Sequence, residues 1–167
     1  LSSLRILATT PPIDGPGGVL GAAGPDAVLS FQHGDLFSTK PTVVPVLSSM
    51  FFDIDDLPQL EADGILESVI IHEMGHALGF GSLWTQNELI LPLGGVGLVQ
   101  YTEGEYAIRG YGQDIGSPVA SFVPLEQRGG GGTALAHWFD SPPFFNQVFT
   151  PAFTKEIMTG FACDLDP

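Results

Sequence analysis

The stretch DGILESVIIHEMGHALG, residues 63–79, decides the fold of this 167-residue chain. Its apolar side chains cover most of a helical circumference, a pattern typical of an α-helix inside a folded domain. Asp63 is a good N-cap, Glu67 places a negative charge in the first turn, and Gly79 suits the left-handed residue that follows many helices. We therefore predict a helix over residues 63–79. The polar residues in the middle of it need an explanation.

A metal site formed by two histidines, with a glutamate between them, supplies that explanation. His72 and His76 stand four residues apart, so a helix points both imidazoles to one side. Zn²⁺ accepts imidazole ligands in tetrahedral geometry, and Glu73 can reach a water on the same ion to act as general base. Two core histidines with ordinary hydrogen bonds are the alternative, but burying two imidazoles and a carboxylate without partners is costly. The sequence favours the metal site.

A third protein ligand must come from elsewhere in the chain. In the compact motif H-E-x-x-H-x-x-G-x-x-H it would stand at position 82, where this chain has Ser82, a poor zinc ligand. His137 is the natural candidate, because it follows a flexible glycine-rich run at residues 129–132 and precedes the aromatic anchor Trp138. We predict that His137 completes the site.

Other assignments stay open at this point. His33 lies upstream of the helix in a polar turn and is expected at the surface. Glu103 or Glu105 would be the third ligand if the chain belonged to a different H-E-x-x-H clan. Asp140, three residues after His137, would either orient a ligand imidazole or cap a turn.

Composition excludes several classes of protein. Five basic residues against nineteen acidic ones give a net charge of −14, which is the wrong sign for a nucleic-acid binder. An apolar content of 44% argues against disorder, and no apolar run reaches the ~20 residues that span a bilayer. Cys163 is the single cysteine, so neither an internal disulfide nor a cysteine-rich zinc site can form. The acidic residues Asp53, Asp55 and Asp56 are expected in a solvated turn rather than a calcium site.

Residues 72–81, HEMGHALGFG, followed by an insertion and then His137-Trp138, resemble the leishmanolysin-type metzincins. In that family the third zinc-binding histidine is displaced far along the chain, and here His137 lies 58 positions after Gly79. Residues 156–160, EIMTG, resemble the family's Met-turn, in which Met158 would form an apolar floor beneath the histidines. Residues 15–18 and 23–25 also resemble the N-terminal part of the family.

This resemblance implies a zinc-dependent metalloendopeptidase that hydrolyses peptide bonds in a peptide or protein bound in an extended conformation. It implies one catalytic Zn²⁺ ion on His72, His76 and His137, with Glu73 as general base and Gly79 and Met158 as structural residues near the site. It also implies a secreted or extracellular protein. A non-catalytic zinc-binding adhesin or structural module with the same fold is the alternative, although metal binding alone does not require Glu73.

The expected fold is α+β, of the metzincin type: a twisted mixed β-sheet, an active-site helix and a loop-rich C-terminal subdomain with a Met-turn. Residues 4–9 and 43–52 read as strands, and Pro45 suggests that the second is an edge strand. The resemblance to metzincins implies that an extended substrate runs along this strand, although its apolar residues are equally explained as core. Residues 15–24 read as a glycine- and proline-rich loop. We predict one catalytic domain, residues 1–167, made of an N-terminal subdomain (1–81), a loop-rich insertion (82–136) and a shortened segment with the third ligand and the Met-turn (137–167).

Overall fold

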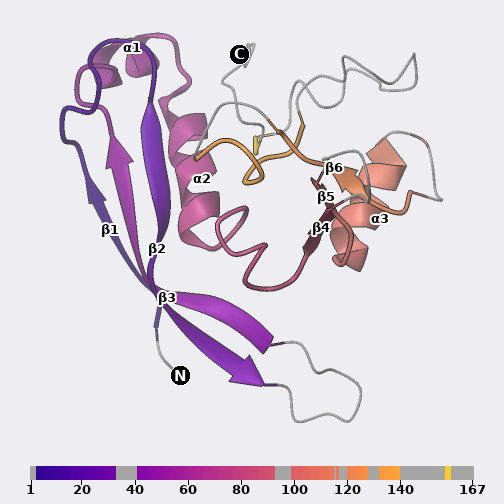
Figure 1. Ribbon diagram of the computed structural model, residues 1–167. Coiled ribbons are helices and arrows are strands. Elements are labelled where there is room, and N and C mark those ends of the chain that lie inside the picture. Colours follow the sequence, from indigo (N-terminus) through magenta and orange to yellow (C-terminus); the bar gives the residue numbers. More distant parts are fainter. Residues whose placement is uncertain are drawn as a thin grey trace. The chain divides into compact units, whose positions relative to one another are not determined.

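The computed structural model describes residues 3–32, 41–92, 99–114, 116, 120–127, 132–139 and 157–158. The chain divides into two compact units, Leu1–Leu83 and Trp84–Asp166. The first unit holds a mixed sheet packed against helices, and the second holds a small antiparallel sheet and one helix (Figure 1). The predicted α+β class and mixed sheet are therefore confirmed, whereas a single catalytic domain stays a prediction.

Three strands form the sheet of the first unit: β1 (Arg5–Thr9), β2 (Gly21–Gln32) and β3 (Pro41–Phe52). Their order is β1-β3-β2, with β1 parallel and β2 antiparallel to β3. The prediction of an edge strand over residues 43–52 is wrong, because β3 is the central strand. Pro45 is tolerated there since β1 pairs only with Leu47 to Phe51, so that at position 45 the strand has a described partner on one side alone.

The predicted single helix over residues 63–79 is two helices in the structure. They are α1 (Leu57–Ala62) and α2 (Leu66–Ala77), separated by Gly64 in a left-handed conformation with φ +73°. The N-cap assignment of Asp63 is wrong: it is the C-cap of α1, and its N–H is donated to the carbonyl of Gln59 at 2.9 Å. The expected left-handed residue after the helix is confirmed, with φ +101° at Gly79.

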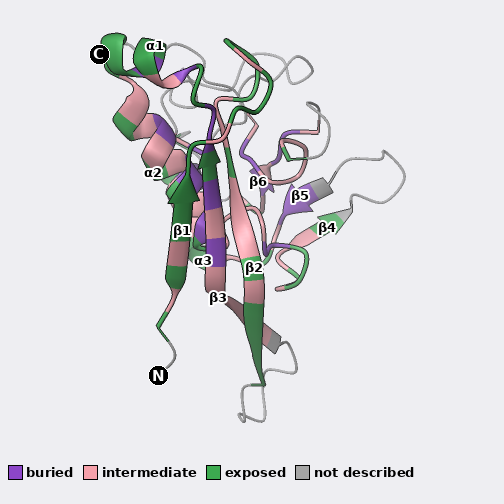
Figure 2. Cartoon of the chain, turned by 90° about the vertical axis from the view of Figure 1, so that its left-hand side faces the viewer, coloured by how far each residue is buried: buried purple, intermediate pink, exposed green. Residues whose placement is uncertain are grey.

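The core of the first unit lies where α2 packs on β2 and β3. Its buried side chains alternate along β3 and recur on one face of α2 (Figure 2). They are Met50, Phe52, Leu60, Val69 and Ala77. The opposite face of α2 exposes Ile71, Met74 and Leu78, so the helix is not enclosed all round as its composition suggested.

Two buried carboxylates hold the loop that leads into β2. Asp53 accepts hydrogen bonds from three consecutive backbone N–H groups of residues 13–15, and Asp56 accepts one from Gly17. These bonds, with the N–H of Asp14 as the largest cause, lower the pKa of Asp53 although burial opposes them. The prediction of a solvated turn is wrong for both residues, because their contacts with a loop about 40 positions away are invisible in the local sequence. The predicted loop over residues 15–24 ends at Leu20, and β2 begins at Gly21.

The second unit has short elements. β4 (Ile90–Pro92), β5 (Val99–Tyr101) and β6 (Val123–Pro124) form an antiparallel sheet in the order β4-β5-β6, and α3 spans Glu105–Asp114. Trp84, Tyr101 and Trp138 pack as a cluster, with ring centroids 4.7 to 5.3 Å apart. Within the described parts of the chain, no helix is long and apolar enough to cross a membrane.

Candidate metal centre

His72 and His76 come from adjacent turns of α2 and present their Nε2 atoms to each other. The two Nε2 atoms lie 3.1 Å apart, and the rings meet edge to face at 82°. Two nitrogens on one tetrahedral Zn²⁺, each about 2.0–2.1 Å from the ion, stand roughly 3.3 Å apart. The pair is therefore spaced to share one ion.

The C-terminus of α2 fixes the ring of His76. Gly79 donates its N–H to the carbonyl of His76 at 3.0 Å, and Phe80 donates its N–H to the carbonyl of Gly75 at 2.9 Å, which is a Schellman motif. This turn brings the carbonyl of Phe80 to 2.9 Å from Nδ1 of His76. With the Nδ1 proton donated to that carbonyl, the lone pair of Nε2 faces the site. Gly79 is required for two reasons. Its φ is +101°, and an added Cβ would lie 2.9 Å from Cδ1 of Leu83.

Ser82 stands where the compact motif has its third histidine, and the structure gives it a different role. Its hydroxyl donates to the carbonyl of His76 at 3.0 Å. On the other side of the helix end, the hydroxyl of Ser48 donates to the carbonyl of Ala77 at 2.7 Å. Both hydroxyls donate to carbonyls of the last turn of α2, and at His76 this bond adds to the one from the N–H of Gly79. Ser82 thus stabilises the end of the histidine-bearing helix.

Glu73 is buried on α2 and follows His72 directly in the sequence. Its Oε2 atom is buried and has no hydrogen-bond partner. Burial raises its pKa from 4.5 to about 7. A buried carboxylate oxygen of this kind fits a site that receives a water or another polar group.

Gly21, the first residue of β2, leaves the space that Glu73 occupies. A Cβ at Gly21 would lie 3.0 Å from both Cγ and Oε1 of Glu73 and 3.1 Å from the carbonyl of Phe51. The sequence interpretation treated this glycine only as part of a flexible loop. Its real requirement depends on the pairing of β2 with β3, and no local signal in the sequence reveals it.

His137 lies in a turn of the second unit and is 5% exposed. Its Nδ1 lies 2.9 Å from the carbonyl of Thr133, so this ring too can donate from Nδ1 and keep Nε2 for a metal. Glu126 donates its backbone N–H to the carbonyl of His137 at 3.0 Å. Trp138 donates its N–H to the carbonyl of the buried Met158, also at 3.0 Å. Met158 therefore supports the segment that carries His137, and its role as a floor beneath the histidines stays a prediction.

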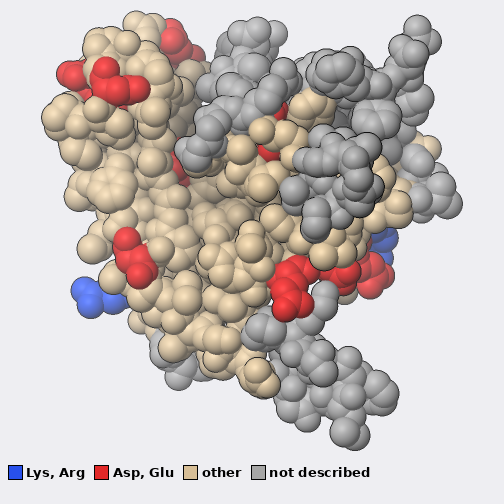
Figure 3. Space-filling view, viewed as in Figure 1, with Lys and Arg blue, Asp and Glu red and all other residues tan. Residues whose placement is uncertain are grey.

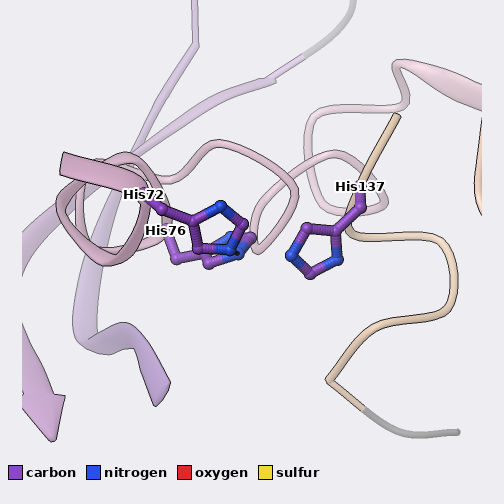
Figure 4. Close-up of side chains that lie close together, drawn as sticks. All are labelled: His72, His76 and His137. Carbon is purple, nitrogen blue, oxygen red and sulfur yellow. Dashed lines mark hydrogen bonds between the residues drawn. The ribbon is translucent and has the colours of Figure 1, made fainter. Parts of the chain in front are cut away.

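His72, His76 and His137 form a group able to hold a metal ion, with one ligand atom from each lying within 4.8 Å of the others (Figure 4). Three imidazoles, two of them with Nδ1 beside a carbonyl, are a donor set that suits Zn²⁺. Glu103 and Glu105 are exposed and do not belong to the group. His33, Asp140 and Cys163 lie outside the described residues.

No protein-family profile matches the chain, and no curated protein matches its sequence. The resemblance to metzincins therefore depends on the motif and on the geometry of the site alone.

The buried carboxylate predicts how the stability of the metal-free protein depends on pH. The pKa of Glu73 is about 7 in the folded protein against 4.5 in the unfolded chain, so between these values the folded state holds a proton that the unfolded state releases. The free energy of unfolding should therefore fall as pH rises from about 4.5 to about 7, by up to roughly 3 kcal/mol.

Urea unfolding in the presence of a chelator, at several pH values, measures this contribution. Wild type and Glu73→Gln should have similar stabilities at low pH. At high pH wild type should be less stable relative to Glu73→Gln, because only wild type acquires a buried charge. The difference between the two curves cancels the effect of all other carboxylates. Parallel curves would contradict the burial argument.

Proposed function

We propose that the protein is a zinc-dependent endopeptidase of the metzincin type, similar to leishmanolysin. The observation that carries the proposal is the group of three histidines with Glu73 next to the first of them. A site that only held a metal would have no use for a buried carboxylate with an unpartnered oxygen beside the ligands.

In the proposed reaction, His72, His76 and His137 would hold a Zn²⁺ ion, which would supply Lewis-acid chemistry at the attacking water and the scissile carbonyl. Glu73 takes the proton of that water at Oε2 and delivers it to the leaving amine. Its raised pKa suits this exchange, since a general base works best when its pKa lies near the working pH. The carbonyls of Phe80 and Thr133 hold His76 and His137 in the tautomer that keeps Nε2 for the ion.

The substrate would bind along β2 rather than along β3, where the sequence placed it. β2 is an outer strand of the described sheet, and its first residue, Gly21, lies against Glu73. An extended peptide that pairs with this end of β2 would bring a backbone carbonyl close to the carboxylate. Residues 21–24 include two glycines and two alanines, and such small side chains leave room for a second backbone.

Metal content and cleavage, measured on one preparation, test the proposal. We expect one zinc ion per chain and cleavage of an unfolded protein such as casein that stops with a chelator and returns with Zn²⁺. Zinc bound at one ion per chain without cleavage of casein or of a peptide library would support the non-catalytic module. A chain that binds no zinc would contradict both functions.

A further inference from the structure

Glu126 is a fully buried carboxylate that the proposed reaction does not use. It is 1% exposed, and its Oε1 accepts the backbone N–H of Gln127 at 2.9 Å. The acidic side chains visible in Figure 3 occur in separate groups at the surface, where water solvates them. Burying a carboxylate is costly, because the charge loses its hydration. The burial of Glu126 therefore needs a reason.

Glu126 stands opposite the proposed third zinc ligand. Leu125 and Trp138 form an antiparallel bridge, so the residue after the first, Glu126, lies against the residue before the second, His137. The backbone N–H of Glu126 is donated to the carbonyl of His137 at 3.0 Å, which agrees with this register. Opposite residues of an antiparallel pair point to the same face, with Cβ atoms about 4.5–5.5 Å apart. The buried carboxylate and the buried imidazole therefore leave the backbone side by side.

The backbone of Glu126 also holds the turn that orients the imidazole. Leu135 donates its N–H to the carbonyl of Glu126 at 2.7 Å and has a φ of +64°, a left-handed conformation that is costly for a leucine. In this turn the carbonyl of Thr133 accepts the N–H of Ala136 at 3.3 Å and lies 2.9 Å from Nδ1 of His137. Strained backbone of this kind persists only where its surroundings hold it. Glu126 is bonded both to the turn and to His137, so it contributes to fixing the position of the ring.

A cation on three imidazoles would give the carboxylate a role as well. Neutral imidazoles leave the double positive charge of a bound Zn²⁺ uncompensated, and a negative charge buried nearby stabilises such a cation. We propose that Glu126 is a positioning residue for His137, and that its buried carboxylate strengthens zinc binding at that imidazole. Glu126 is not a member of the group of ligands, so its charge acts through His137. The inference rests on the zinc site of the proposed function but not on peptide cleavage.

Two substitutions separate the charge of Glu126 from its shape. Glu126→Gln keeps the size of the side chain and an oxygen for the N–H of Gln127, but it removes the charge. Glu126→Asp keeps the charge on a shorter side chain. The zinc dissociation constant should rise about 10–100-fold in Glu126→Gln, the cost typical of a lost outer-shell partner, and by less in Glu126→Asp. A residue that only filled space would give the opposite order.

Competition with a chelator of known affinity measures these dissociation constants. Glu105→Gln is the matched control, because Glu105 is exposed on α3 of the same unit and its substitution removes the same charge at the surface. It should bind zinc as wild type does. The circular dichroism of every variant in excess chelator should match that of wild type, so that a change in affinity reports on the site and not on the fold.

Equal zinc affinity in wild type and Glu126→Gln overturns the proposal and leaves the zinc site intact. Weaker binding in Glu126→Asp than in Glu126→Gln overturns it too, as does a Glu126→Gln that is unfolded in the chelator, because either result assigns the residue a purely structural role. A wild type that binds no zinc overturns this proposal together with the proposed function. The two failures are therefore distinguishable.

Discussion

Glu73→Gln is expected to lose nearly all peptide cleavage while it keeps its zinc. Glutamine has the size and shape of glutamate, but its amide cannot take the proton of the attacking water. General-base catalysis by a positioned side chain contributes about 10²–10⁴-fold, and kcat should fall by that factor. The zinc content should stay at one ion per chain, because the three proposed ligands are imidazoles. Cleavage of a fluorogenic peptide and metal analysis on the same samples measure both quantities.

Glu67→Gln is the matched control for this variant. Glu67 lies on the same helix, in its first turn, and is exposed, so its substitution removes the same charge outside the site. We expect it to keep both zinc and activity. If Glu73→Gln retained more than a tenth of the wild-type kcat, another group would have to be the base. If it lost its zinc, the carboxylate would be needed for metal binding, and the proposed division of roles would be wrong.

The parts of the site that the sequence predicts correctly depend on neighbours along the chain. A spacing of four residues places His72 and His76 on one side of any helix, and the left-handed residue at Gly79 follows from the end of the same pattern. His137 was reached by elimination among four histidines, and it belongs to the group that the structure describes. That assignment depended on which side chains can bind zinc and not on helical spacing.

Two of the three features that the sequence predicts wrongly depend on contacts between distant segments. Pro45 suggested an edge strand, but the position of β3 depends on how far β1 extends beside it. Asp53 looked solvated because the three N–H groups that it accepts belong to a loop near residue 14. Asp63 has the chemistry of an N-cap, yet a helix ends there, since Gly64 turns the chain before α2 begins. A non-local contact decided the outcome at Pro45 and at Asp53, whereas at Asp63 the neighbouring Gly64 did.

His137→Ala is expected to lose the tightly bound zinc. Removing one of three protein ligands should weaken zinc binding by more than the 10–100-fold that loss of an outer-shell partner costs. Competition with a chelator of known affinity measures the change. Glu103→Gln and Glu105→Gln are the controls, since both carboxylates were candidates for the third ligand and both are exposed. Tight zinc binding that survives in His137→Ala and fails in either control would transfer the third-ligand role to that glutamate.

Zinc should also stabilise the wild type in a way that His137→Ala cannot reproduce. The three proposed ligands lie far apart in the sequence, so an ion held by all of them would bind the folded chain and not the unfolded one. A ligand at 1,000 times its dissociation constant stabilises the state that it binds by about 4 kcal/mol. Thermal unfolding of wild type should accordingly shift upward with Zn²⁺. In His137→Ala the same addition should shift the melting temperature much less, because the two remaining imidazoles bind the ion much more weakly. An equal shift in both proteins would mean that His137 is not a zinc ligand.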